Sequence, residues 1–389
     1  MIVEWGSAAA GVDSAEVCSI RERMIQLHRV LSFGLFIGAS LALGAAEKPS
    51  VILARVKIHE QTSSATPKIA SELPYLFTAQ ATRLPKDAFE NIRLQLPNTG
   101  VFVGEPQRYG GAWEEIGIEA SYGNLTAFNA TFPKGTYYVR LNPVSGSATT
   151  LKLSVKNLDF PTVPKITNYA DAQKLPAGSD FALKWNAFSS SSTKDRMILT
   201  VTSVNDDYDF VATPDPETPD ALAASKRSYT IKAKTLPPGT DFVGQLIFVR
   251  ADTRSETSKG YPYASGAASM TRFKIRTAGS KDTKAPTVSS SSPADGATKV
   301  SPKATLTITF KEPMRTRQGW SVSFMNLGGK QPGFEWTSPT KFTVKPPSGG
   351  WPKNTEIGIM LNPEGYTPWF QDLAGNPLAP KTFKFKTGS

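Results

Sequence analysis

Residues 304–310 read Ala-Thr-Leu-Thr-Ile-Thr-Phe, and this alternation of apolar and polar side chains decides the fold class. Successive side chains of a strand point to opposite faces, so a period of two buries one face and leaves the other in water. Similar alternation occurs at 52–59, 151–155 and 383–386. With 30 glycines and 30 prolines to supply turns, the sequence predicts an all-β chain of antiparallel β-sandwiches.

A five-residue turn pattern recurs along the chain. It reads Phe-Pro-Lys-Gly-Thr at 132–136, Leu-Pro-Pro-Gly-Thr at 236–240 and Trp-Pro-Lys-Asn-Thr at 351–355. Proline fixes φ, and glycine or asparagine tolerates a positive φ, so each copy favours a tight turn that opens a strand. The copies recur at about the length of one sandwich, roughly 100 residues. This spacing matches three sandwich units, although a looser copy, Leu-Pro-Ala-Gly-Ser at 175–179, shows that the motif alone does not count domains.

Two polar, turn-rich stretches divide these units. Residues 159–164 contain two prolines, and residues 277–284 are mostly Thr, Lys, Ser, Gly and Asp, as in short linkers. We expect domains at 47–160, 161–278 and 279–389, arranged as beads with limited flexing.

The first 46 residues have the composition of a leader. Basic residues up to Arg29 precede an apolar run at 30–43, and the small residues Gly-Ala-Ala follow at 44–46. This order predicts a secretory signal peptide, whereas an uncleaved anchor is the alternative. The apolar run is too short for an ordinary membrane span. We expect a secreted, cell-surface or periplasmic protein without a membrane span after signal cleavage.

The first 46 residues also bear on where translation starts and on whether the mature chain contains a cysteine. Translation from Met24 gives a leader of ordinary length at 24–46, and Met1 is the other candidate start. Cys18, the single cysteine, precedes the expected cleavage site. The mature chain would then have no disulfide and no thiolate chemistry.

The third unit carries a recognisable order of motifs. Asp-Thr-Lys-Ala-Pro-Thr-Val stands at 282–288, Ser-Pro-Ala-Asp-Gly-Ala at 292–297, and Asp-Leu-Ala-Gly-Asn-Pro-Leu at 372–378. In order and spacing, residues 282–387 resemble the bacterial Ig-like domain of S-layer and other surface proteins. The resemblance implies an immunoglobulin-like sandwich, a surface setting and no enzymatic activity. Residues 161–278 show a weaker Ig-like or fibronectin-like resemblance.

Few residues offer catalytic chemistry. Besides His28 in the leader, His59 is the only histidine, and the alternating pattern places it on a wet strand face. A metal site with two or three histidines is therefore excluded within one chain. Glu114 and Glu115 would point to opposite strand faces, which suits two-carboxylate chemistry badly. We expect no catalytic residue, no metal ligand and no cofactor.

Two acidic regions leave alternatives open. Asp206 to Asp220 form the densest acidic stretch, which we expect to be a solvated loop, with a calcium site as the alternative. Asp372 and Asn376 are expected to shape a turn with Gly375, although their oxygens suit a cation.

The charge and the aromatic residues bear on partners. The net charge is +11, and Lys and Arg are scattered along the chain, which favours solvated faces, with attraction to an anionic surface polymer as the alternative. Nucleic acid is not expected for a secreted chain. Tyr366, Trp369 and Phe370 crowd one segment and are the predicted ligand-binding residues, for a cell-surface polymer, a glycan or another surface protein.

The sequence thus predicts an exported, non-catalytic Ig-like protein with a structural or adhesive role at the bacterial cell surface. The alternatives are a carbohydrate-binding accessory protein and a hydrolase with its site in residues 47–160.

Overall fold

The computed structural model is built mainly of strands, which hold 50% of the residues against 4% in helices. The all-β prediction is therefore confirmed. The described residues are 49–85, 88–100, 102–103, 107–110, 113–189, 192–204, 208–255, 261–316, 319–327, 329 and 331–389. The expected leader at 1–46 lies outside them.

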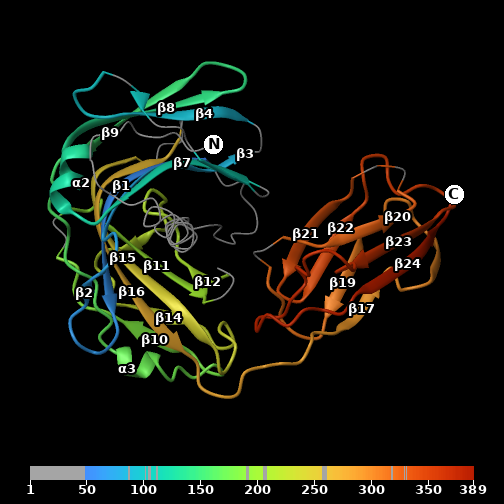
Figure 1. The fold of residues 1–389 in the computed structure, drawn as a ribbon. Coiled ribbons are helices and arrows are strands. Elements are labelled where there is room, and N and C mark those ends of the chain that lie inside the picture. Colours follow the sequence, from blue (N-terminus) through green and yellow to red (C-terminus); the bar gives the residue numbers. More distant parts are fainter. Residues whose placement is uncertain are drawn as a thin grey trace, which may run out of the picture.

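A ten-stranded sheet dominates the first two units (Figure 1). Its order is β12-β11-β15-β16-β1-β3-β7-β6, with β13 beside β11 and β2 beside β1. Its strands are β1 (Ser50–Gln61), β2 (Lys68–Ile69), β3 (Tyr75–Pro85), β6 (Gln107–Gly110), β7 (Trp113–Tyr122), β11 (Arg196–Ser203), β12 (Asp209–Ala212), β13 (Leu222–Ala223), β15 (Asp241–Ser255) and β16 (Tyr263–Arg276).

Strand β1 joins the two units. It runs parallel to β16, from Val51 opposite Tyr263 to Gln61 opposite Phe273, and antiparallel to β3. The first strand of the first unit and the last strand of the second therefore share one hydrogen-bonded ladder. The expectation of separate beads is wrong for these two units, while the domain boundary at 160 stays a prediction.

The segment expected to link these units lies bound along the sheet. The Ser269 hydroxyl donates to the Pro161 carbonyl (2.7 Å), and the Thr271 hydroxyl donates to the Pro164 carbonyl (2.6 Å). Gln61 and Ile166 exchange two hydrogen bonds of 2.9 and 2.8 Å. Because side chains of β1 and β16 hold its carbonyls, this segment is part of the packed structure and not a free linker.

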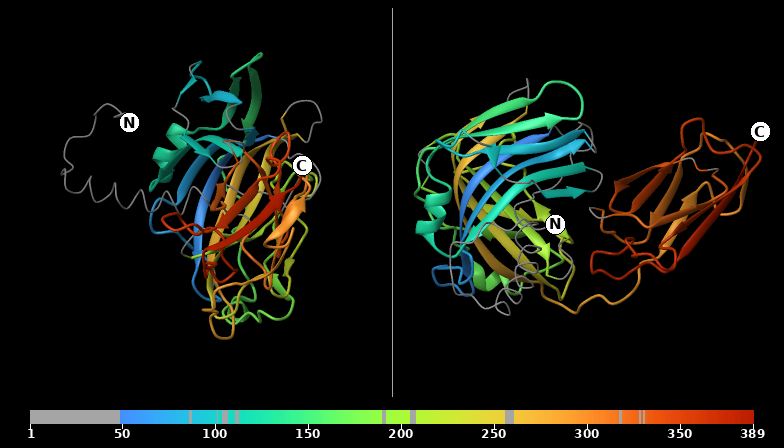
Figure 2. Two further views of the ribbon diagram at one scale, coloured as in Figure 1. Left: turned by 90° about the vertical axis from the view of Figure 1, so that its right-hand side faces the viewer. Right: turned by 45° about the horizontal axis from the view of Figure 1, so that its top comes forward.

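Two smaller sheets pack against one face of the large sheet (Figure 2). Leu53 of β1 contributes to the core under the first, and Phe273 of β16 to the core under the second. The first sheet has the order β5-β4-β8-β9, and the second pairs β10 with β14. Their elements and the two short helices are β4 (Phe89–Gln95), β5 (Phe102–Val103), β8 (Gly135–Pro143), β9 (Thr149–Val155), β10 (Phe181–Lys184), β14 (Ser228–Ile231), α2 (Leu125–Thr131) and α3 (Tyr169–Ala172).

The central part of the opposite face of the large sheet is also apolar and buried. Val56 and Ile58 of β1 belong there to a cluster with Ile247 and Met270. Strand β1 is therefore buried on both faces, and the expected wet face of 52–59 is wrong. His59 is only 4% exposed, and its Nδ1 lies 3.3 Å from the Met270 carbonyl oxygen.

The third unit is a sandwich of two four-stranded sheets. Their orders are β17-β19-β22-β21 and β18-β24-β23-β20. Leu306, Ile308 and Phe310 of the alternating stretch are buried between them, as predicted. The strands are β17 (Val288–Ser292), β18 (Ala297–Val300), β19 (Leu306–Phe310), β20 (Val322–Met325), β21 (Gly333–Ser338), β22 (Lys341–Lys345), β23 (Glu356–Leu361) and β24 (Lys381–Thr387).

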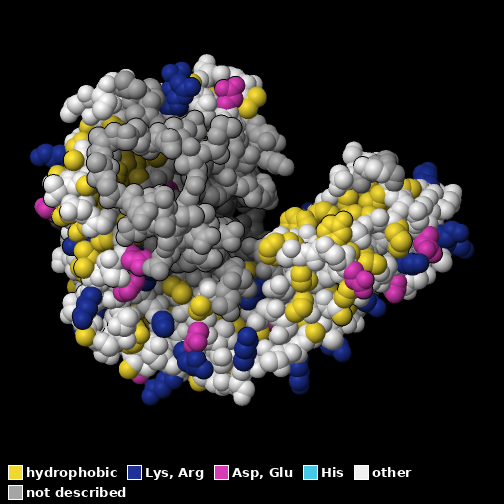
Figure 3. Space-filling model, viewed as in Figure 1, with side chains coloured by type: hydrophobic (Ala, Val, Ile, Leu, Met, Phe, Trp, Pro, Cys, Tyr) yellow, Lys and Arg dark blue, Asp and Glu magenta, His cyan; other side chains and the backbone are white. Residues whose placement is uncertain are grey.

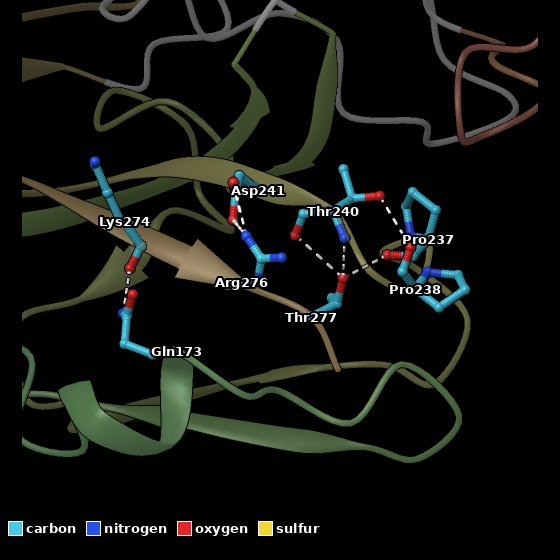
Figure 4. A network of polar contacts seen from close by, with 8 residues as sticks. All are labelled: Gln173, Pro237, Pro238, Thr240, Asp241, Lys274, Arg276 and Thr277. Atoms are coloured by element: carbon cyan, nitrogen blue, oxygen red, sulfur yellow. Dashed lines mark hydrogen bonds and ion pairs between the residues drawn. The ribbon is translucent and has the colours of Figure 1, made fainter. Parts of the chain in front are cut away.

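The recurring turn has the same hydrogen bonds in the second and third units. In the second, the Thr277 hydroxyl donates to the Pro237 carbonyl (2.7 Å) and accepts from the Thr240 amide (2.9 Å), as Figure 4 shows. In the third, the Thr387 hydroxyl donates to the Pro352 carbonyl (2.6 Å) and accepts from the Thr355 amide (2.9 Å). A threonine at the end of the last strand therefore fixes both turns.

The turn residues behave as their types predict. Gly239 has φ 64° and Asn354 has φ 52°, so both occupy the left-handed region. The apolar residue that opens each copy is buried: Phe132, Leu236 and Trp351 are 6%, 1% and 1% exposed.

The first copy of the turn differs in its partners. Ser154 stands opposite Thr136, but the Ser154 amide and carbonyl bond to the Ser265 hydroxyl of β16. The last strand of the first unit is thereby attached to the large sheet.

Candidate functional site

The predicted binding loop lies at one end of the third unit. It follows β23 and is anchored by Asn362, whose amide nitrogen donates to the Phe370 carbonyl (2.9 Å) and whose amide oxygen accepts from the Phe370 N–H (3.0 Å). Asn362 has φ 48°, a conformation that asparagine adopts more readily than most residues. This two-point anchor fixes both ends of the loop at 363–369.

The loop displays two aromatic side chains. Tyr366 is 71% exposed and Trp369 is 40% exposed. Phe370 is different, because it is 1% exposed and its ring lies 4.9 Å from that of Phe342 in the core. The predicted surface role of Phe370 is therefore not retained, since a buried ring cannot contact a partner in this conformation.

A second tryptophan lies near this loop. Trp320 is 39% exposed and packs on Phe334, with 5.5 Å between ring centroids. The indole of Trp369 lies over the neighbouring Gly319, where a Cβ would come within 3.4 Å of its Nε1. Tyr366, Trp369 and Trp320 form what we call the aromatic patch.

The aromatic patch collects the exposed aromatic side chains of the described part of the chain. Figure 3 shows apolar side chains gathered on the face of the third unit turned to the viewer. Sequence reasoning missed Trp320, although a tryptophan between Gln318-Gly319 and a strand was a usable signal. An exposed apolar surface of this kind is typical of a contact site.

A carboxylate cluster lies where the second and third units meet. One oxygen from each of Asp282, Glu312 and Asp372 falls within 4.8 Å of the others. Burial raises the pKa of Glu312, and the charges of Asp372 and Asp282 raise it further. Both Asp372 oxygens accept hydrogen bonds from Asn376, of 2.9 and 2.8 Å. These contacts form the turn that the sequence predicts, and sequence reasoning did not anticipate the approach of Glu312 and Asp282.

The same joint contains a cation–aromatic contact. The guanidinium of Arg315 lies 5.0 Å from the ring centroid of Tyr208, and the Thr316 amide donates to the Tyr208 hydroxyl (3.1 Å). Leu373 packs on the core of the second unit. An adjoining pocket of about 360 Å³ is lined by Leu236, Pro237, Glu312, Asp372 and Leu373. The third unit therefore contacts the second through named side chains.

The remaining candidates have mixed outcomes. Asp206 and Asp207 lie outside the described residues. Asp215 and Glu217 are 2% and 0% exposed, so the expectation of a fully solvated loop is wrong. Arg254 donates to the Pro216 carbonyl (2.6 Å) and holds this loop near the large sheet. The side chains of Glu114 and Glu115 are not among those described.

Catalysis by His59 has no geometric support. Its ring is buried next to the Met270 carbonyl, and burial is the main cause that lowers its pKa. A general base must reach the proton that it removes from a substrate, and the buried ring of His59 is not placed to do so.

Comparison with known proteins confirms the predicted family of the third unit. Residues 282–387 match the family model described as a bacterial Ig-like domain. No curated protein sequence matches the chain. No helix among the described residues is long and apolar enough to cross a membrane.

Solved structures similar to the chain contain fibronectin-type and Ig domains. The FN1–FN3 domains of chicken CNTN1 are 13% identical, with 81% of this chain and 95% of that chain covered and a TM-score of 0.20. The I9–I11 tandem from titin is 8% identical, with 87% and 99% covered and a TM-score of 0.18. Ig-like domains of this surface type suggest a non-catalytic structural or adhesive role.

Proposed function

We propose that this chain is an exported, non-catalytic Ig-like protein that acts structurally or adhesively at the bacterial cell surface, with the aromatic patch as its contact for a surface glycan. Three observations support the proposal: the bacterial Ig-like match, the leader composition and the exposed aromatic patch.

The aromatic patch is the observation that carries the binding role. An aromatic ring offers a flat apolar face and loses little side-chain entropy on binding. Sugar rings present C–H groups on one face, which stack on such a surface. Tyr366 stands on a loop fixed at both ends by Asn362 and Phe370, so the patch is preorganised and binding orders few additional groups.

The experiment is a sedimentation assay of the mature chain 47–389 with peptidoglycan sacculi as the probe. Trp369→Ala and Tyr366→Ala should each weaken binding by about tenfold, since truncation of an aromatic anchor commonly costs more than 1 kcal/mol. Met325→Ala is the matched control, because Met325 is 43% exposed in the same unit but lies outside the patch.

Unchanged binding by both aromatic variants would refute this role for the patch. So would a loss of binding that only accompanies unfolding of the third unit, which circular dichroism of each variant detects.

A further inference from the structure

Two arginines face each other on the outer surface of the sheet β5-β4-β8-β9. Arg93 of β4 stands directly opposite Arg140 of β8, and both side chains are exposed. Lys152 of β9, opposite Tyr138, lies diagonally beside Arg140. These three residues define the basic face. It belongs to the top lobe of Figure 1, in another unit from the aromatic patch.

This pairing breaks a local rule that the charged cross-strand pairs elsewhere in the described strands follow. Like charges directly opposite on neighbouring strands destabilise a sheet, and opposite charges stabilise it. At the corresponding kind of position, Arg276 stands opposite Asp241 and forms an ion pair of 2.9 Å. Arg93 and Arg140 have no ion-pair partner among the described residues.

A groove runs beside the two arginines. It has a volume of about 390 Å³, and its polar lining consists of Asn91, Arg93, Arg140, Asn142 and the carboxylate of Glu90. The Asn142 side chain donates to the Asn91 side chain (2.6 Å), which fixes two amides between the guanidinium groups and the strand ends. The loop joining β8 to β9 forms a wall with Gly146.

The chemistry of this groove selects a class of ligand. Guanidinium groups bind carboxylates bidentately. The adjacent side-chain amides can donate hydrogen bonds to sugar hydroxyls and accept hydrogen bonds from them. A simple anion has no hydroxyl groups that would use these amides. We propose that the basic face is a binding site for a carboxylated polysaccharide, a polymer of uronic acid, distinct from the aromatic patch. The ligand carboxylate supplies the ion-pair partner that neither Arg93 nor Arg140 has among the described residues, although Glu90 also lines the groove.

The test is affinity electrophoresis of the mature chain 47–389 in gels containing polygalacturonate. Arg93→Gln/Arg140→Gln should lower affinity by about tenfold or more, because both guanidinium groups lose their charge-assisted hydrogen bonds to the ligand carboxylates. Lys184→Gln/Lys274→Gln is the matched control, since it removes two exposed positive charges from the second unit. The control should retain binding, and methyl-esterified polygalacturonate should not bind the unmodified chain.

Three outcomes would overturn the proposal. They are equal losses in the two double variants, equal binding of the methyl ester, and polyphosphate binding that is stronger than polygalacturonate binding and lost with the arginines. Trp369→Ala should retain polygalacturonate binding, so a failure here is distinguishable from a failure of the glycan contact on the third unit. Loss of uronate binding in Trp369→Ala would also contradict two separate sites.

Discussion

The third unit and the first two units solve the same packing problem in different ways. The third closes two four-stranded sheets over its own core. The first two share a sheet, because β1 pairs with β16 across more than 200 residues of sequence. A turn motif that recurs three times therefore does not guarantee three independent domains. Whether a unit folds as an independent domain depends on whether the edge strands of its sheets pair with strands of another unit.

Separating the units should have the largest effect. Residues 282–389 are expected to unfold cooperatively on their own, as the complete sandwich and its buried Trp351 suggest. Residues 47–160 alone should show no cooperative transition, because removing β16 exposes one ladder edge and part of both faces of β1. Differential scanning calorimetry measures both, and mixing 47–160 with 161–281 should restore a transition. A cooperative melt of 47–160 alone would contradict the shared-sheet interpretation.

The two threonines that fix equivalent turns offer a smaller and more local perturbation. Thr277→Val and Thr387→Val should each cost about 1–3 kcal/mol, since each leaves a carbonyl and an amide that are at least partly buried without a hydrogen-bond partner. In calorimetry of the chain 47–389, Thr277→Val should lower the transition temperature of only the first two units (47–278), which we call the shared-sheet units. Thr387→Val should lower the transition temperature of only the third unit. Thr150→Val, at an exposed strand position, is the control. Loss of both transitions in either variant would argue against independent units.

The smallest expected effect concerns pH. Burial lowers the pKa of His59 below its ordinary value, so the unfolded chain binds the proton more readily. Stability of the shared-sheet units is therefore complete above the unfolded pKa, about 6.5, and decreases as pH falls through it. His59→Gln should reduce this acid dependence in urea titrations at pH 7.5 and 5.5. The third unit has no histidine, so its own pH dependence should be the same in the variant as in the unmodified chain. An unchanged slope for the first two units in the variant would refute the assignment.

The aromatic candidates show how far sequence reasoning reaches within a site. It selected the segment containing Tyr366, Trp369 and Phe370 because aromatic residues crowd a loop. The structure exposes the first two and buries Phe370, since the Asn362 anchor turns that residue inward. Trp320 joins the patch through a contact at Gly319, some 50 residues away in sequence. Local composition can identify a loop, but only packing determines which of its side chains face water.

The sequence by itself determined the all-β class, the identity of the third unit and the conformation of the turns, because these depend on side-chain period, local motifs and the φ preferences of Pro, Gly and Asn. Only the tertiary structure decided that β1 is buried on both faces, that residues 159–164 lie against the large sheet, and that Arg93 meets Arg140. The physical reason is that strand pairing over long sequence distances has no local period. Such long-range pairing is selected by the free energy gained when whole sheet faces are buried and when the backbone N–H and C=O groups of each strand find hydrogen-bond partners.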